Sequence, residues 1–177
     1  TSSPEESATF WTAWLNSIAP SLVEYVQGTN VVHVVRQTFG VTIDEWDFAP
    51  MGLAKGALFT VVKATRTSGS GAVDVFALYN YHLGSGSPVV GADGENIAYN
   101  AGRDAFYEWG PSGVAFGHGA FGSTHHGATP QNPYSVMLSG ANLGDDAGTS
   151  GATTDAVCGF QFSLGNLSAP AYAGWFS

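Results

Sequence analysis

Residues 57–81 carry the clearest secondary-structure signal in the chain, and their sequence is ALFTVVKATRTSGSGAVDVFALYNY. Two segments rich in β-branched and aromatic residues, 57–66 and 72–81, flank the glycine- and serine-rich residues 67–71. β-branched and aromatic side chains fit the pleated surface of a sheet, and a short Gly/Ser connection is typical of a hairpin. We therefore predict that the two segments form an antiparallel pair.

The sequence on both sides of this pair has the same strand-like character. Upstream, residues 30–39 and 41–48 extend the predicted pair to a four-stranded antiparallel meander. Downstream, glycine, serine and proline separate short candidate strands, which are residues 97–99, 105–109, 114–117, 134–139, 156–164 and 171–176. Regular short strands with Gly-rich turns favour a mainly β protein, an antiparallel β-sandwich, over alternating βαβ units.

The N-terminal residues follow a helical pattern instead. Residues 3–6, SPEE, match a capping box with proline in the first turn. The apolar stripe that follows ends at Pro20 and consists of Trp11, Trp14, Leu15 and Ile18. We predict one amphipathic helix over residues 1–20 and a β-sandwich over residues 21–177, which together form a single globular domain. Trp11 and Trp14 are expected to be buried against this domain or against a partner.

Composition and charge limit the classes of partner. The chain has 177 residues, of which 44% are hydrophobic, so it contains enough apolar surface to fold around one core. Five Lys and Arg residues against fourteen Asp and Glu residues give a formal charge of -9. This charge disfavours nucleic acid and anionic membrane surfaces as partners, and no apolar run is long enough to span a bilayer.

The use of cysteine and lysine indicates the compartment. Cys158 is the single cysteine, and it lies in the apolar residues 156–160, so we expect a buried, inert side chain. A low lysine content with one cysteine and five tryptophans is typical of exported bacterial β proteins. We therefore expect a secreted or periplasmic location.

Three short stretches occur in an informative order. They are residues 73–84 (VDVFALYNYHLG), a strand around Val114, and residues 156–167 (AVCGFQFSLGNL). This order resembles the N-terminal super-sandwich domain of bacterial glucoamylases and glucodextranases, with Tyr81 at a position where that family would have a proline. The resemblance implies a non-catalytic β-sandwich that supports or completes the active site of a carbohydrate-cleaving (α/α) barrel, which would be a partner domain or subunit.

Aromatic side chains offer surfaces on which the apolar faces of sugar rings can stack. The candidates for carbohydrate binding are Trp109, Tyr107, Tyr81 and His82. Trp109 ranks first and Tyr107 second, because a loop-forming Gly-Pro pair follows them, whereas Tyr81 and His82 lie at a predicted strand end. Aromatic residues also fill sandwich cores, which is the alternative interpretation.

Three histidines lie within nine positions on glycine-rich segments that could fold back on one another. They are His118, His125 and His126. Three imidazoles are a ligand set for zinc or copper, and they allow a small His-dependent metalloenzyme. Their spacing does not follow a standard metal motif, so the alternative is a solvated loop without metal.

Acidic residues supply two further candidate sites. The first is a calcium site, since calcium prefers oxygen ligands. Its candidate ligands are residues 93–96 (DGEN), the pair Asp145 and Asp146, and Asp155. The alternative is that these residues form solvated turns without an ion. Asp104 and Glu108 could serve as a glycosidase pair only if their carboxylates faced each other across a cleft at about 5 to 10 Å.

These patterns leave three functions open. The first is a non-catalytic β-sandwich domain or processed chain of an exported, glucoamylase-like carbohydrate hydrolase. The second is an independent exported module, lectin-like or metal-binding, and the third is a small metalloenzyme that uses the three histidines. The expected partners are a carbohydrate and a catalytic domain or subunit, and the candidate ions are calcium and zinc.

Overall fold

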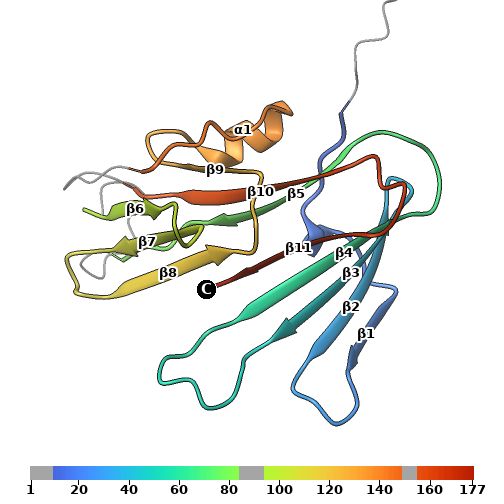
Figure 1. Ribbon diagram of the computed structural model, residues 1–177, viewed down its shortest axis with the longest axis horizontal. Coiled ribbons are helices and arrows are strands. Elements are labelled where there is room, and N and C mark those ends of the chain that lie inside the picture. The colour runs from blue at the N-terminus through green and yellow to red at the C-terminus, as the bar shows by residue number, and fades with distance from the viewer. Residues whose placement is uncertain (1–9, 84–93, 149–154) are drawn as a thin grey trace, which may run out of the picture.

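The computed structural model describes residues 10–83, 94–148 and 155–177, and most of its regular structure is antiparallel strand (Figure 1). The prediction of a mainly β, antiparallel fold is confirmed. The strands are β1 (Leu22–Tyr25), β2 (Val32–Thr38), β3 (Val41–Phe48), β4 (Phe59–Arg66), β5 (Val73–Tyr79), β6 (Asn96–Asn100), β7 (Ala105–Trp109), β8 (Ala115–Ala120), β9 (His125–Ala128), β10 (Cys158–Gly165) and β11 (Ala171–Phe176). The helical elements are a 3-10 turn, η1 (Leu15–Ser17), and one α-helix, α1 (Pro133–Ser139).

The strands form two sheets. The larger sheet has eight strands in the order β1-β2-β3-β4-β11-β8-β7-β6, and the smaller has three in the order β5-β10-β9. Strand β11 pairs with β4 along its length but with β8 only at Trp175 and Phe176, so the large sheet divides there into two arms. Figure 1 shows the β6–β8 arm beside the small sheet, while the β1–β4 arm spreads away from it.

The hydrophobic core lies where the two sheets face each other. Val62 and Phe106 from the large sheet and Phe160 from the small sheet are completely buried and belong to one cluster. Cys158, on β10, is buried in the same cluster, as the sequence predicted. Both sheets therefore contribute side chains to one core, which is the packing expected of a sandwich.

The predicted pairing of residues 57–66 with 72–81 is wrong. Strand β4 pairs with β3 and β11, whereas β5 pairs with β10 in the other sheet. The connecting residues are held elsewhere, because the amides of Thr67 and Ser68 both donate to the carbonyl of Gly40 in the β2–β3 turn. After this contact the chain passes from β4 in the large sheet to β5 in the small sheet, so the predicted meander ends at β4.

The predicted N-terminal helix is also wrong for the part that the structure describes. Trp14 has an extended backbone, and only the three residues of η1 are helical; residues 3–6 lie outside the described residues. A short helix is marginal in water unless tertiary packing supports it. Within this chain Trp11 is 71% exposed and Trp14 is 44% exposed, so the expected burial against its own sheet does not occur. Their rings contact Phe39 and Tyr134 at the surface.

Residues 134–139, predicted as a strand, belong to α1. The side chain of Asn132 accepts hydrogen bonds from the amides of Tyr134 and Ser135, Pro133 starts the helix, and Gly140 ends it in a left-handed conformation. These are standard helix boundary signals, which outweighed the β-forming residues between them. Neither helical element in the described part of the chain has the length and apolar character of a membrane-spanning helix.

Gly110 brings the turn after β7 close to the backbone that follows β5. A Cβ atom at position 110 would lie 2.0 Å from the carbonyl oxygen of Leu83, whereas one at Gly117 in β8 would have its nearest neighbour at 3.9 Å. We expect Gly110→Ala to lower the free energy of unfolding by about 1–3 kcal/mol, because backbone must move to make room. Gly117→Ala should raise it by about 0.5–1 kcal/mol, as usual for a glycine within a strand. Urea unfolding of both variants measures this difference, and equal stabilities would contradict the close approach.

Candidate functional site

Strand β7 presents different chemistry on its two faces. Phe106 and Glu108 point inward and are completely buried, whereas Tyr107 and Trp109 point outward with 38% and 41% of their surfaces exposed. Successive side chains of a strand alternate between the two faces of the sheet, so this pattern follows from the sequence of β7 itself.

The outward face carries two open aromatic rings. Tyr107 and Trp109 are two positions apart, which places their Cα atoms roughly 7 Å from each other along the strand. The residues paired with them on the neighbouring strands are small or bear an amide, namely Ala98 and Asn96 on β6 and Gly117 and Ala115 on β8. Arg103 donates a hydrogen bond to the Tyr107 hydroxyl at 3.2 Å. Tyr107 and Trp109 therefore form an aromatic platform, which has short side chains beside it and the guanidinium of Arg103 at its edge.

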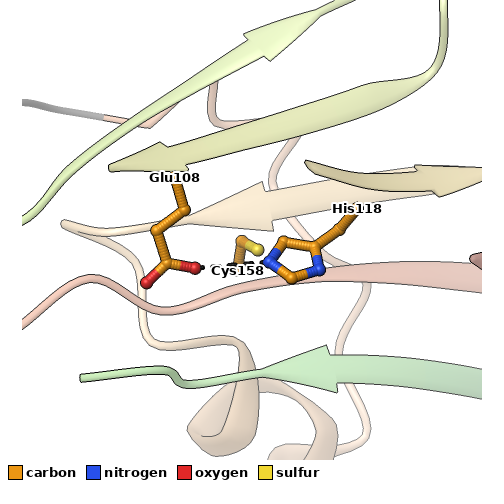
Figure 2. Close-up of side chains that lie close together, drawn as sticks. All are labelled: Glu108, His118 and Cys158. Carbon is orange, nitrogen blue, oxygen red and sulfur yellow. Dashed lines mark ion pairs between the residues drawn. The ribbon is translucent and has the colours of Figure 1, made fainter. Parts of the chain in front are cut away.

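The inward face contributes to a buried polar cluster of Glu108, His118 and Cys158 (Figure 2). In the β7–β8 pairing, Glu108 and His118 are diagonal neighbours on the inner face, and Cys158 reaches them from β10 in the opposite sheet. One donor atom from each residue lies within 4.8 Å of the others, and all three side chains are completely buried. Of the residues that the structure describes, these form the one group of three that could hold a metal ion.

The atoms of this buried cluster lack hydrogen-bond partners. His118 Nε2 and Glu108 Oε2 lie 3.4 Å apart, which is an ion-pair distance and is longer than the roughly 2.7–3.2 Å of a good N–H···O hydrogen bond. Both carboxylate oxygens of Glu108 and both ring nitrogens of His118 are buried without a hydrogen-bond partner. An unsatisfied buried polar group costs about 1–3 kcal/mol, so this cluster is unfavourable unless something else satisfies it.

The electrostatic environment of Glu108 also opposes a free carboxylate. Burial raises the pKa of this carboxyl, and the nearby His118 lowers it only in part. The carboxylates of Glu95 and Asp155 raise the same pKa further. A bare negative charge at Glu108 is therefore disfavoured, and a proton or a cation must offset it.

Cys158 is unsuited to act as a free nucleophile. Burial raises the pKa of its thiol well above the ordinary value, and the carboxylate of Glu108 raises it further. Nucleophilic attack requires a thiolate that a substrate can reach, and Cys158 offers neither.

A series of stacked rings leads from the surface to His118. Tyr81 and Phe116 are partly exposed and stack on each other with centroids 4.9 Å apart. Tyr81 also stacks on His118 at 5.3 Å, and Tyr79 stacks on His118 at 4.1 Å. The hydroxyl of Tyr79 is buried without a hydrogen-bond partner. These contacts fix the plane of the imidazole ring.

The four residues predicted to contact carbohydrate fall into two groups. Tyr107 and Trp109 form the outward platform, whereas Tyr81 stacks on the ring of His118 and His82 lies near Asp155, with Nδ1 and Oδ1 3.9 Å apart. The sequence could indicate the first group, because alternation in β7 exposes both rings. It could not indicate that Tyr81 contacts the buried cluster.

The three histidines predicted as metal ligands lie in two places. His118 joins Glu108 and Cys158, whereas His125 and His126 both face Asp145, at 3.2 and 3.4 Å between ring nitrogen and carboxylate oxygen. Burial raises the pKa of Asp145, but the hydrogen bond from the His126 amide and the two imidazoles outweigh it, and the pKa is lowered overall.

Several acidic candidates are already engaged. Glu95 is buried, and its two carboxylate oxygens accept hydrogen bonds from the amides of Leu83 and Ala156; Asp93 lies outside the described residues. Asp104 accepts from the Tyr99 hydroxyl and from both the amide and hydroxyl of Ser123. Asp104 lies in the turn before β7 and Glu108 is completely buried, so the two carboxylates do not face each other across an open cleft as a glycosidase pair must.

No protein-family model matches this chain, and no curated protein is significantly similar to it.

Because Cys158 is buried, the rate at which its thiol reacts with a reagent tests whether the buried cluster is closed to solvent. We expect a thiol reagent to modify the native protein only as fast as the protein opens or unfolds, and to modify one thiol per chain at once in denaturant. As a control, Tyr172→Cys in a Cys158→Ala background should react immediately, because Tyr172 is 63% exposed. Immediate, complete modification of the native wild-type protein would contradict the closed cluster.

Proposed function

We propose that this chain is a non-catalytic carbohydrate-binding β-sandwich that assists a carbohydrate-cleaving domain or subunit, and that Tyr107 and Trp109 form its sugar-binding platform. The observation that carries the proposal is the pair of half-exposed rings on one face of β7. The fold and the resemblance to glucoamylase N-terminal domains are consistent with this role.

The chemistry of the platform suits a sugar. A pyranose ring has apolar C–H faces and a polar rim, so it stacks on an aromatic ring and hydrogen-bonds at its edge. Tyr107 and Trp109 provide the flat surfaces, Gly117 and Ala115 leave them uncovered on the β8 side, and Arg103 provides donors beside Tyr107. The formal charge of -9 favours a neutral glycan over an anionic one.

The position of the nearby acids favours binding without catalysis. Glu108 faces the core on the opposite side of β7, and Asp104 is hydrogen-bonded to Tyr99 and Ser123. Neither carboxylate is placed to act on a sugar held at Tyr107 and Trp109. A catalytic partner would supply the acid and base, as the resemblance implies.

An independent lectin-like module is the second candidate function, and the same platform supports it. The two candidates differ in what the platform serves. A module that assists a hydrolase should raise the activity of its partner on the same glycan that it binds, whereas a lectin should bind without any such effect.

We expect Trp109→Ala and Tyr107→Ala each to weaken binding of an α-linked glucan oligosaccharide by at least about tenfold, because each removes one stacking surface. Isothermal titration calorimetry on the whole chain measures the affinity. The matched controls are Tyr172→Ala and Trp11→Ala, which remove exposed aromatic rings at other places and should leave binding unchanged.

The wild-type chain should bind the oligosaccharide without releasing reducing sugar. Binding that survives in both platform variants would refute the assigned site. Absence of binding to α-linked, β-linked and anionic oligosaccharides alike would refute the proposed function.

A further inference from the structure

We propose that Glu108, His118 and Cys158 bind a single zinc ion, which links the two sheets from inside the sandwich (Figure 2). The ligands would be a carboxylate oxygen from β7, an imidazole nitrogen from β8 and the thiolate sulfur from β10. This site is separate from the aromatic platform, which lies on the other face of β7.

The spacing of the donor atoms fits a shared ion better than a hydrogen bond. The Nε2–Oε2 distance between His118 and Glu108 is 3.4 Å, whereas a good N–H···O bond spans about 2.7–3.2 Å. Two ligand atoms that each lie about 2.0–2.1 Å from a tetrahedral zinc ion are about 3.3–3.4 Å apart. The sulfur of Cys158 is within 4.8 Å of both, so small side-chain rotations complete the arrangement.

The unsatisfied atoms of the cluster are an independent indication of a ligand. Both oxygens of Glu108 and both nitrogens of His118 are buried with no hydrogen-bond partner in the described structure. Buried polar groups are normally paired, and a buried carboxylate is normally paired with a cation. A zinc ion satisfies one nitrogen, at least one oxygen and the negative charge at the same time.

The donor set selects the class of metal. Calcium and magnesium prefer ligands that are all oxygen, whereas zinc accepts imidazole, thiolate and carboxylate together. All three side chains are completely buried, so a substrate has no access and the site is structural. A water molecule or the second oxygen of Glu108 would fill the fourth position. The stacking of Tyr79 and Tyr81 orients the imidazole, a task that an outer hydrogen bond usually performs.

Zinc binding would couple to folding, because the three ligands come together only when β7, β8 and β10 are in place. Formation of the zinc–sulfur bond requires the thiol proton of Cys158 to leave to solvent. The thiolate is then stabilised by the metal rather than by solvent.

The decisive experiment uses the whole chain. It is unfolded in denaturant that contains a chelator, and then refolded with zinc, with cobalt(II) or without metal. After gel filtration we expect one zinc per chain by elemental mass spectrometry. With zinc at about a hundredfold excess over its dissociation constant, the midpoint of thermal unfolding should rise by about 5–10 °C. The cobalt-loaded protein should show a thiolate-to-cobalt charge-transfer band, and because Cys158 is the single cysteine, that band identifies its ligand in the unaltered protein.

Variants locate the other ligands. Glu108→Gln and His118→Gln should each weaken zinc binding at least tenfold, and Cys158→Ala should abolish the charge-transfer band. His125→Gln is the matched control, because His125 faces Asp145 and should leave stoichiometry and spectrum unchanged. A wild-type chain that retains no zinc, shows no cobalt–thiolate band and gains no thermal stability would overturn the proposal, whether or not the variants fold. Retention of one zinc per chain by folded Cys158→Ala would overturn it equally.

Discussion

The burial of Glu108 beside His118 is the interaction on which the centre of this structure depends. A carboxyl group cannot lie between two sheets at low cost unless a proton, a hydrogen-bond donor or a cation accompanies it. Its neighbour in the same sheet, His118, is too far for a good hydrogen bond, and its neighbour across the core is the thiol of Cys158. The relative position of β7, β8 and β10 is therefore tied to the way in which this one acid is satisfied.

Two connections bring these strands together. In the first, Thr67 and Ser68 are hydrogen-bonded to Gly40 where the chain passes from β4 into the small sheet, and β5 pairs with β10 and not with β4. Strand β11 then returns to the large sheet and joins its two arms through the short pairing at Trp175 and Phe176. Because of this route, β7 and β8 lie opposite β10, although Cys158 is far from both in the sequence. The remaining arm, β1–β4, contributes core residues such as Val62 but no part of the buried cluster.

Local patterns in the sequence predicted individual strands better than their partners. Residues 105–109 and 171–176 were predicted with the bounds that β7 and β11 have, because strand alternation and flanking turns are local signals. Whether a Gly/Ser turn closes a hairpin or leads to another sheet depends on distant contacts, here with Gly40. The same dependence on distant contacts limits the prediction of the aromatic platform and the buried cluster. The alternation that exposes Tyr107 and Trp109 is visible in the sequence. The sequence places His118 near His125 and His126, whereas its neighbour in the structure, Cys158, lies on a distant strand of the other sheet. An acid at an inward position of β7 was the signal that could have indicated the cluster.

The alternation of β7 also explains how one short strand can take part in two separate sites. Side chains at positions 107 and 109 point to solvent, whereas those at 106 and 108 point to the core, and a shift of pairing by one residue would exchange the two sets. Burial of the Phe106 ring against Phe160 favours this register, because a shift by one residue would expose the apolar ring to water. The backbone of the sheet separates the platform from the cluster, so a truncation of Trp109 leaves the packing of Glu108 and His118 in place. Packing of the inward side chains thus sets the orientation of the platform, whereas the two platform rings take no part in the packing of the core.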